Sequence, residues 1–323
     1  MTEKKKISVV LFQLGGPDSP AAVEPFLYNL FCDPDIIDFF GAWFARRPLA
    51  RYIARKRAGV VREHYDAIGG HSPIRLLTER QARALETALA PHCEASCFIA
   101  MRYWNPLTAE AVAEVNASGA ADLVLLPMYP QYSFATTSSS LKEWKRLYHP
   151  NGNVPRTHVI EKFFDHPLYI QSIAEKIALS LTHFEEPDRA HIVFSAHGLP
   201  LSLIERGDPY AKQVEETVRL VMQRGAWKNA HTLCYQSKVG RREWLSPSLT
   251  GTIEKLARAG EKQLLIVPIA FVTEHIETLH EINIEAREEA HKLGIEKFEM
   301  MPAVGDSPTF ISALADLVLK AIA

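Results

Sequence analysis

The stretch HIVFSAHGLP, residues 191–200, joins an apolar strand to a histidine, a glycine and a proline. Its run I-V-F has no polar alternation, as expected of a strand that is covered on both faces of a parallel sheet. VVLFQLGGP, residues 9–17, has the same order of apolar strand, small-residue turn and proline. DLVLLPMYPQ, residues 122–131, likewise parallels QLLIVPIAFV, residues 263–272, because each is a strand interrupted by proline. We therefore expect two related halves.

Short β-branched runs alternate with amphipathic stretches along the chain. The expected strands are 7–14, 97–103, 122–128, 157–163, 191–196, 231–237, 263–269 and 297–303. Strands that alternate with helices favour parallel sheets with helices on both faces. We predict an α/β fold of two similar Rossmann-like doubly wound domains, each with a four-stranded parallel sheet. The first domain is 1–163, the second is 164–305, and the apolar last helix, 306–323, packs back on the first.

The composition excludes several classes of protein. The 323 residues carry a net charge of −2, which gives no electrostatic support for a nucleic-acid partner. The cysteines are too scattered for a zinc or disulfide framework and indicate a reducing compartment: Cys32, Cys93, Cys97 and Cys234. The longest apolar run, 264–272, is far shorter than the roughly 20 residues that span a bilayer. The start, MTEKKKISVV, lacks a signal-peptide pattern, so we expect a cytoplasmic protein.

His197 follows the apolar strand of the second half. In open parallel sheets, ligands bind beyond the carboxyl ends of the strands, and an imidazole there can accept a proton near neutral pH. A histidine at a strand end is also a common structural residue, so the residues alone leave both roles open. In the first half, LGGP, residues 14–17, fits neither GxGxxG nor GxxxxGK[ST] and favours a tight turn over a phosphate loop.

The run FVTEHIETLHEINIEAREEAH, residues 271–291, is rich in acids and histidines. At α-helical spacing its acids fall near one line, with two imidazoles close by: Glu274, Glu277, Glu281 and Glu285, with His275 and His280. The pattern suits either a solvated helix face or a path for a divalent metal, for which carboxylate and imidazole are fitting ligands.

A basic segment follows an aromatic one near the start of the chain. IIDFFGAWF, residues 36–44, precedes PLARYIARKRAGVVREHY, residues 48–65. The cations are Arg46, Arg47, Arg51, Arg55, Lys56, Arg57 and Arg62. Apolar surface beside guanidinium groups suits an apolar ligand that bears carboxylates, or an interfacial helix on an anionic membrane, or a plain basic helix face.

Seven segments in order resemble the ferrochelatases, the class II chelatases of haem synthesis. They are LGGPDSP, YDAIGGHSPI, MRYWNPLT, PMYPQYSFATTSSSL, SAHGLP, YQSKVG with Trp244, and FVTEHIETLHEINIE. The resemblance implies two chelatase-like domains with a porphyrin cleft between them. It also implies a lyase that inserts Fe²⁺ into protoporphyrin IX, the terminal step of haem synthesis, by ring distortion and pyrrole deprotonation. The alternatives are a coproporphyrin III ferrochelatase, a sirohydrochlorin chelatase, or a non-catalytic porphyrin or haem carrier.

The resemblance also assigns roles to residues. His197 accepts pyrrole protons or holds the metal, and Glu277 faces it as metal ligand or proton partner. Glu274 and His275 are further catalytic positions, Glu281 and Glu285 further metal positions, on a helix that carries a π-type turn in the family. The substrate positions are Leu14, Arg57, Tyr65, Ser72, Arg102, Tyr103, Tyr129, Ser237, Trp244 and Phe271. Among these, Arg57, Ser72 and Ser237 match propionate contacts, and residues 36–50 match an apolar lip that also suits peripheral contact with the inner face of a membrane.

The chain departs from the family pattern at three places. Gly198 stands where serine is usual, and Glu274 stands where aspartate is usual. Phe134 stands where cluster-bearing members have a cysteine, and no cysteine follows Cys234. We therefore predict a bacterial type without a [2Fe-2S] cluster and without a permanently bound cofactor. Its expected partners are a porphyrin and ferrous iron as substrates, and its oligomeric state is left open between monomer and homodimer.

Overall fold

The computed structural model describes residues 4–34, 42–150, 152, 154–238 and 242–323. Residues 36–41 of the predicted lip lie outside this set. The chain divides into two compact units. Unit 1 comprises Met1–Tyr129, Ser133–Glu161 and Leu314–Ala323, and unit 2 comprises Pro130–Tyr132 and Lys162–Ala313. The last helix, α11 (Pro308–Ile322), is therefore shared between the two units.

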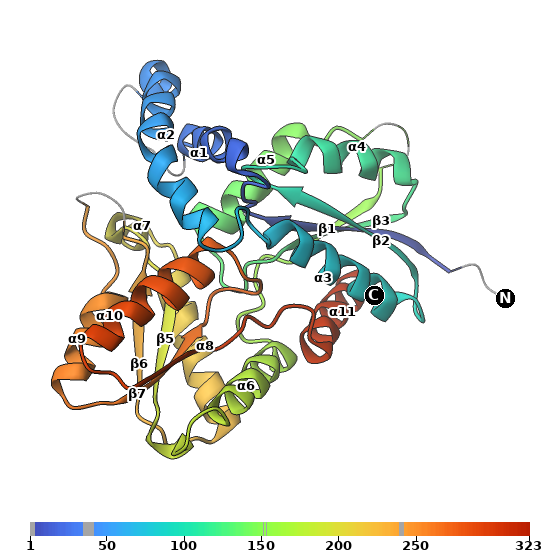
Figure 1. The fold of residues 1–323 in the computed structure, drawn as a ribbon. Coiled ribbons are helices and arrows are strands. Elements are labelled where there is room, and N and C mark those ends of the chain that lie inside the picture. Colours follow the sequence, from blue (N-terminus) through green and yellow to red (C-terminus); the bar gives the residue numbers. More distant parts are fainter. Residues whose placement is uncertain (1–3, 35–41, 151, 153, 239–241) are drawn as a thin grey trace. The chain divides into compact units, whose positions relative to one another are not determined.

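Unit 1 is built on a four-stranded parallel sheet in the order β2-β1-β3-β4. Its strands are β1 (Lys6–Gln13), β2 (Glu94–Met101), β3 (Asp122–Pro127) and β4 (Arg156–Val159). Figure 1 shows α3 (Ile74–Leu89) on one face of the sheet, and α4 (Thr108–Ser118) and α5 (Ser139–Leu147) on the other. Every residue of β1 after Lys6 is buried, because helices cover both faces.

Besides its sheet, the helices that cover it and the end of α11, the described part of unit 1 contains two packed helices and two short turns. They are α1 (Val23–Cys32), α2 (Ala42–Asp66), the 3₁₀ turn η1 (Pro20–Ala22) and the π-helical turn η2 (Phe134–Ser138). Ala50, Ala54 and Ala58 are buried on one face of α2, which lies against α1. Small side chains at this four-residue spacing let the two helix backbones approach closely.

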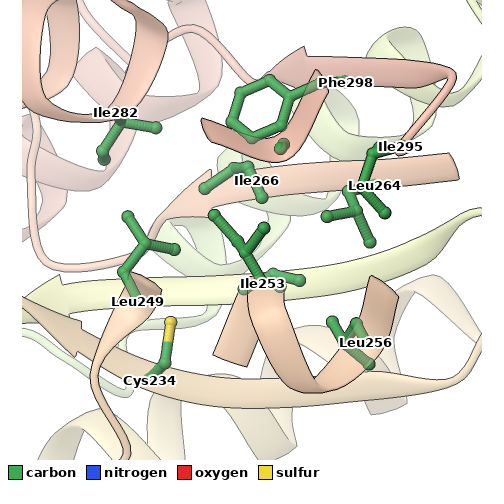
Figure 2. Close-up of a cluster of buried hydrophobic side chains, with 11 residues drawn as sticks. Cys234, Leu249, Ile253, Leu256, Leu264, Ile266, Ile282, Ile295 and Phe298 are labelled. Carbon is green, nitrogen blue, oxygen red and sulfur yellow. The ribbon is translucent and has the colours of Figure 1, made fainter. Parts of the chain in front are cut away.

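Unit 2 repeats the architecture, with a parallel sheet in the order β6-β5-β7-β8. Its strands are β5 (His191–His197), β6 (His231–Gln236), β7 (Gln263–Pro268) and β8 (Lys297–Met300). Its helices are α6 (Pro167–Leu181), η3 (Pro187–Arg189), α7 (Leu201–Glu205), α8 (Tyr210–Gly225), α9 (Leu249–Arg258), the π-helix η4 (Glu277–Ala286) and α10 (Arg287–Lys292). In Figure 1, α9 and α10 lie on one side of the sheet, and α6 and α8 lie on the other. Ile282 of the π-helix belongs to the same buried apolar cluster as Ile253, Ile266 and Phe298 (Figure 2), so the π-helix is anchored to the sheet by apolar contacts.

The predicted fold class is confirmed, and each of the eight strands overlaps its predicted range, although β2 begins at residue 94 rather than 97, and β4 and β8 end at residues 159 and 300 rather than 163 and 303. The prolines that interrupt the second pair of segments end β3 and β7. Pro127 pairs with Phe12 of β1, and Pro268 pairs with Ser195 of β5. On the opposite side, pairing with the edge strands β4 and β8 has already ended before each proline. Proline has no N–H for a sheet ladder and is tolerated at these positions, where one neighbour is missing.

Asp122 is the centre of a polar cluster in unit 1. Its side chain is fully buried and lies 2.8 Å from Lys5 Nζ, 3.2 Å from Arg156 Nε and 2.8 Å from His158 Nε2. Burial acts to raise the pKa of Asp122, but hydrogen bonds from Lys5, His158 and Arg156 outweigh it and lower that pKa. The carboxylate therefore links the starts of three neighbouring strands.

We expect Asp122→Asn to lower the free energy of unfolding at pH 7 by about 1–3 kcal/mol, because it removes the charge that these cations share. A carboxyl with a lowered pKa stabilises the fold above its ordinary pKa and loses this effect as pH falls through the lowered value. The difference between variant and wild type should therefore shrink below about pH 4. Chemical denaturation at pH 7 and pH 3.5 measures it, with exposed Asp165→Asn as the control. Equal destabilisation at both pH values would contradict the prediction.

Candidate active site

His197 and Glu277 form a direct pair in unit 2. His197 ends β5 and Glu277 begins η4, and their Nδ1 and Oε2 atoms are 2.7 Å apart. The imidazole is 37 % exposed and the carboxylate 15 % exposed. Because a carboxylate only accepts, Nδ1–H is the donor and the neutral ring carries its lone pair on Nε2. No hydrogen bond within the described residues engages Nε2, so this atom is available to a ligand.

Each side chain of the pair shifts the pKa of the other toward its charged form. Burial acts to lower the pKa of His197, but the charge and hydrogen bond of Glu277 outweigh it and raise that pKa. Burial acts to raise the pKa of Glu277, but His197 and then His275 hold that pKa well below its usual range. Glu277 therefore stabilises a positive charge on His197, which is what a proton acceptor at this position requires.

Ser237 connects this pair to a second carboxylate. It follows β6 with a φ of 64°, in the left-handed region that few non-glycine residues adopt. Its hydroxyl lies 3.3 Å from Glu277 Oε2 and donates to Glu281 Oε2. Burial, and next the charge of Glu277, raises the pKa of Glu281 to about 7. Ser237, which was predicted to contact a porphyrin propionate, therefore contacts acidic residues of η4 in this structure.

The π-helix changes the predicted alignment of the acidic side chains along one face of an α-helix. Its i→i+5 hydrogen bonds make it wider than an α-helix, and such turns are frequent at functional sites. Glu274 precedes the helix, and its Oε1 accepts from Ala303 N–H at 2.6 Å, so the α-helical spacing was wrong for this residue. His275 Nε2 stays 3.7 Å from Glu277 Oε1. Glu285 is half-exposed and lies 3.6 Å from His280 Nδ1 instead.

Unit 2 therefore brings His197, His275, Ser237, Glu277 and Glu281 together, whereas Glu274 and Glu285 have other contacts. Two predicted macrocycle contacts lie near this group. The Phe271 ring is 4.6 Å from the His275 ring, and Trp244 forms a β-bridge with Pro200, just beyond β5.

Gly198 is explained by close packing at the end of β5. Its N–H donates to Gln236 O at 2.8 Å. A Cβ atom at this position would lie 2.9 Å from Gln236 O and 3.4 Å from the Trp244 ring. The serine that is usual here would require the backbone of β6 to shift, so glycine permits the closer approach found in this chain.

The predicted substrate residues of unit 1 include Arg102 and Tyr103, which follow β2. Arg102 Nη2 lies 2.7 Å from Asp33 Oδ2, and the buried Tyr103 donates its hydroxyl to the same oxygen at 2.7 Å. Ser139 Oγ accepts from Arg102 Nε and donates to Asp33, both at 3.0 Å. Burial, and next the charge of Asp33, raises the pKa of Tyr103 well above its usual value. Asp33, at the end of α1, was not among the predicted residues, yet it orients two of them.

The other predicted residues of unit 1 have separate surroundings. Leu14 O accepts from Tyr103 N–H at 2.9 Å. Tyr65 is buried, and the exposed Arg57 has its guanidinium carbon 5.7 Å from the centre of the Phe31 ring. Burial raises the pKa of Tyr129 above its usual value.

The LGGP segment, for which we predicted a tight turn, is an irregular connection between β1 and η1 with neither a turn nor a bend at residues 14–17. Gly15 has a φ of 83°, and a Cβ on Gly16 would lie 2.5 Å from Ser72 Oγ. Ser72 N–H donates to Pro17 O at 2.8 Å, which holds Ser72 beside this segment. Glycines here allow the backbone to approach Ser72.

A sequence model of the family described as Ferrochelatase matches residues 6–322. This chain belongs to the ferrochelatase family. The ferrochelatase of Geobacter metallireducens is 50 % identical and aligns over 98 % of this chain and 99 % of its own length. That of Geotalea uraniireducens is 49 % identical over 98 % of each chain. That of Thermosynechococcus vestitus is 47 % identical over 98 % of this chain and 82 % of its own.

Solved structures support the fold at much lower identity. SirB from Bacillus subtilis with Fe³⁺ has a TM-score of 0.58 at 13 % identity and covers 99 % of this chain and 96 % of its own. A multi-domain protein of Deinococcus radiodurans with similarity to chelatases has a TM-score of 0.54 at 14 % identity, covering 98 % of this ferrochelatase and 54 % of its own chain. These matches concern the fold alone.

The predicted enzyme class, a lyase of haem and porphyrin biosynthesis, is confirmed by the family membership. No helix within the described residues is both long and apolar enough to cross a bilayer. Membrane contact through residues 36–50 stays a prediction.

Proposed function

We propose that this ferrochelatase inserts Fe²⁺ into protoporphyrin IX and that His197 and Glu277 carry the proton chemistry. The observation that supports this most is the 2.7 Å contact between His197 Nδ1 and Glu277 Oε2 at the carboxyl end of β5. A carrier needs no such acid–base pair, whereas metal insertion releases two pyrrole protons and requires an acceptor for them.

The proton steps use both ends of the imidazole. His197 Nε2 accepts a pyrrole proton, and the Glu277 carboxylate stabilises the imidazolium through Nδ1–H. Deprotonation leaves the pyrrole nitrogens with lone pairs directed at the metal. Because the pKa of His197 is raised, part of it is protonated near neutral pH, and the share of the active base grows as pH rises.

The metal steps use the neighbouring carboxylates. Glu277 and Glu281 share contacts with Ser237 and offer oxygen ligands that can replace water around Fe²⁺. With a pKa of about 7, Glu281 alternates between acid and carboxylate near neutral pH. It can therefore take up the second pyrrole proton when the metal leaves for the ring. Strain in the bound porphyrin supplies about 1–5 kcal/mol toward the distorted ring that accepts the metal.

Parallel anaerobic assays with protoporphyrin IX and coproporphyrin III test the proposal. Fe²⁺ insertion is followed through the Soret band at equal protein and metal concentrations. We expect a larger kcat/KM with protoporphyrin IX. A larger value with coproporphyrin III would assign the alternative substrate, and binding of either porphyrin without turnover would indicate a carrier.

The predicted lack of a [2Fe-2S] cluster belongs to the same proposal. Cys93 and Cys234 are buried, and their thiols donate to Leu89 O and Phe194 O. Burial raises the pKa of both thiols, which disfavours the thiolate that cluster ligation needs. Fe²⁺ acts here as substrate.

A further inference from the structure

Gln236 is held firmly at the end of β6, directly beside His197. The two residues are register partners in the parallel β5–β6 pair, and Gln236 is 6 % exposed. Its backbone oxygen accepts the N–H of Gly198 at 2.8 Å. Its position relative to His197 is therefore fixed by the sheet.

The side chain of Gln236 links a buried hydroxyl to the Glu277 carboxylate. Its Nε2 lies 3.4 Å from Glu277 Oε2, and its Oε1 lies 2.7 Å from Ser195 Oγ. A carboxylate only accepts, so the amide NH₂ must face Glu277, and Oε1 must accept from Ser195. Ser195 is fully buried and stands two residues before His197, on the same face of β5. The carboxylate thus determines the orientation of the amide, and the Ser195 hydroxyl holds the amide oxygen in place.

We propose that Gln236 and Ser195 are positioning residues, which hold Glu277 Oε2 against His197 in the reaction assigned above. Glu277 Oε2 accepts from both His197 Nδ1 and Gln236 Nε2, whereas Oε1 lies 3.7 Å from His275. Without the amide, Oε2 keeps only His197 Nδ1 and Ser237 Oγ as contacts among the described residues, so the carboxylate turns more readily toward His275 and away from His197. The inference rests on the proposed function, and it concerns the rate of the proton step rather than porphyrin binding.

A double-mutant cycle for iron insertion tests this chain of contacts. Gln236→Met keeps the length of the side chain without its hydrogen bonds, and we expect it to lower kcat about tenfold. Ser195→Ala should lower kcat about three- to tenfold. If Ser195 acts through Gln236, the double variant should be no slower than Gln236→Met alone. The KM for porphyrin should stay within about twofold throughout.

Ser172→Ala is the matched control, because it removes a buried hydroxyl that donates to Tyr169 O in α6, away from these contacts. It should leave kcat unchanged. Should Gln236→Met fail to fold, Gln236→Glu retains the shape and opposes Glu277 with a second carboxylate, and it should lower kcat at least as much. If the two reductions in kcat multiply in the double variant, or if the variants change only KM, the inference is overturned while iron insertion by the wild type stands. Absence of insertion by the wild type would overturn the proposed function instead.

Discussion

Replacing His197 with alanine is expected to lower kcat for iron insertion by about 10²–10⁴-fold, the range that a positioned acid–base group contributes. The change removes Nε2, the proposed acceptor of the pyrrole proton. It also leaves Glu277 without the imidazole that lies 2.7 Å away. The measurement is anaerobic single-turnover insertion of Fe²⁺, with porphyrin affinity determined separately by fluorescence quenching. We expect the affinity to change far less than kcat, because the imidazole acts on the proton step.

His183→Ala is the control for His197→Ala. This imidazole is 55 % exposed and lies 4.0 Å from Glu299, so its loss should leave turnover unchanged. Near-wild-type turnover in His197→Ala would contradict the assigned mechanism. A loss of porphyrin affinity as large as the loss of kcat would assign His197 to binding instead.

The fold was predictable because its two halves use the same pattern. Apolar strands and amphipathic helices alternate, and the strands at 9–17 and 191–200 each occupy the second position of the strand order in their sheet. Strands that are buried on both faces need continuous apolar runs, which the sequence shows directly. Proline marked the ends of β3 and β7 for a physical reason, since it lacks a ladder donor.

The geometry of the acidic helix was less predictable. Spacing assigns Glu274 to the same face as Glu277, but the chain enters the helix only at residue 276. Glu274 is held by Ala303 N–H, which lies 29 residues further along the chain. Such a contact overrides local helical preference, and the π conformation itself leaves no clear mark in apolar periodicity.

Ser195, Gln236 and Asp33 were missed because their chemistry depends on neighbours distant in sequence. Ser195 stands inside an apolar strand and looks like a small core residue. It meets Gln236 only through the pairing of β5 with β6, and Asp33 meets Arg102 only because the residue that follows α1 lies beside the residue that follows β2. A polar residue within an otherwise apolar strand was the one available signal, since buried polar groups require partners.

Glu277→Gln is expected to lower kcat at pH 7 by about 10²-fold or more, because the amide keeps the shape but loses the charge that stabilises the imidazolium. In the wild type, Glu277 raises the pKa of His197 against the opposing effect of burial. Without that charge, burial is opposed only by the charge of Glu281, so the pKa of His197 should fall. The free base then forms at lower pH, so the rising limb of kcat/KM should move toward lower pH while the maximum rate drops.

Two measurements check this prediction, the pH–rate profile and the NMR titration of the His197 ring protons. Glu288→Gln is the control, since Glu288 is exposed on α10.

The two pKa shifts also predict how the stability of the fold depends on pH. The lowered pKa of Glu277 stabilises the fold above the ordinary carboxyl pKa, and the raised pKa of His197 does so until pH passes that raised value. Glu277→Gln should therefore destabilise the protein most between these limits, from about pH 4.5 to above pH 6.5. An unchanged ring titration in Glu277→Gln would show that the two side chains are not coupled in solution, and the mechanism would then lose its proton partner.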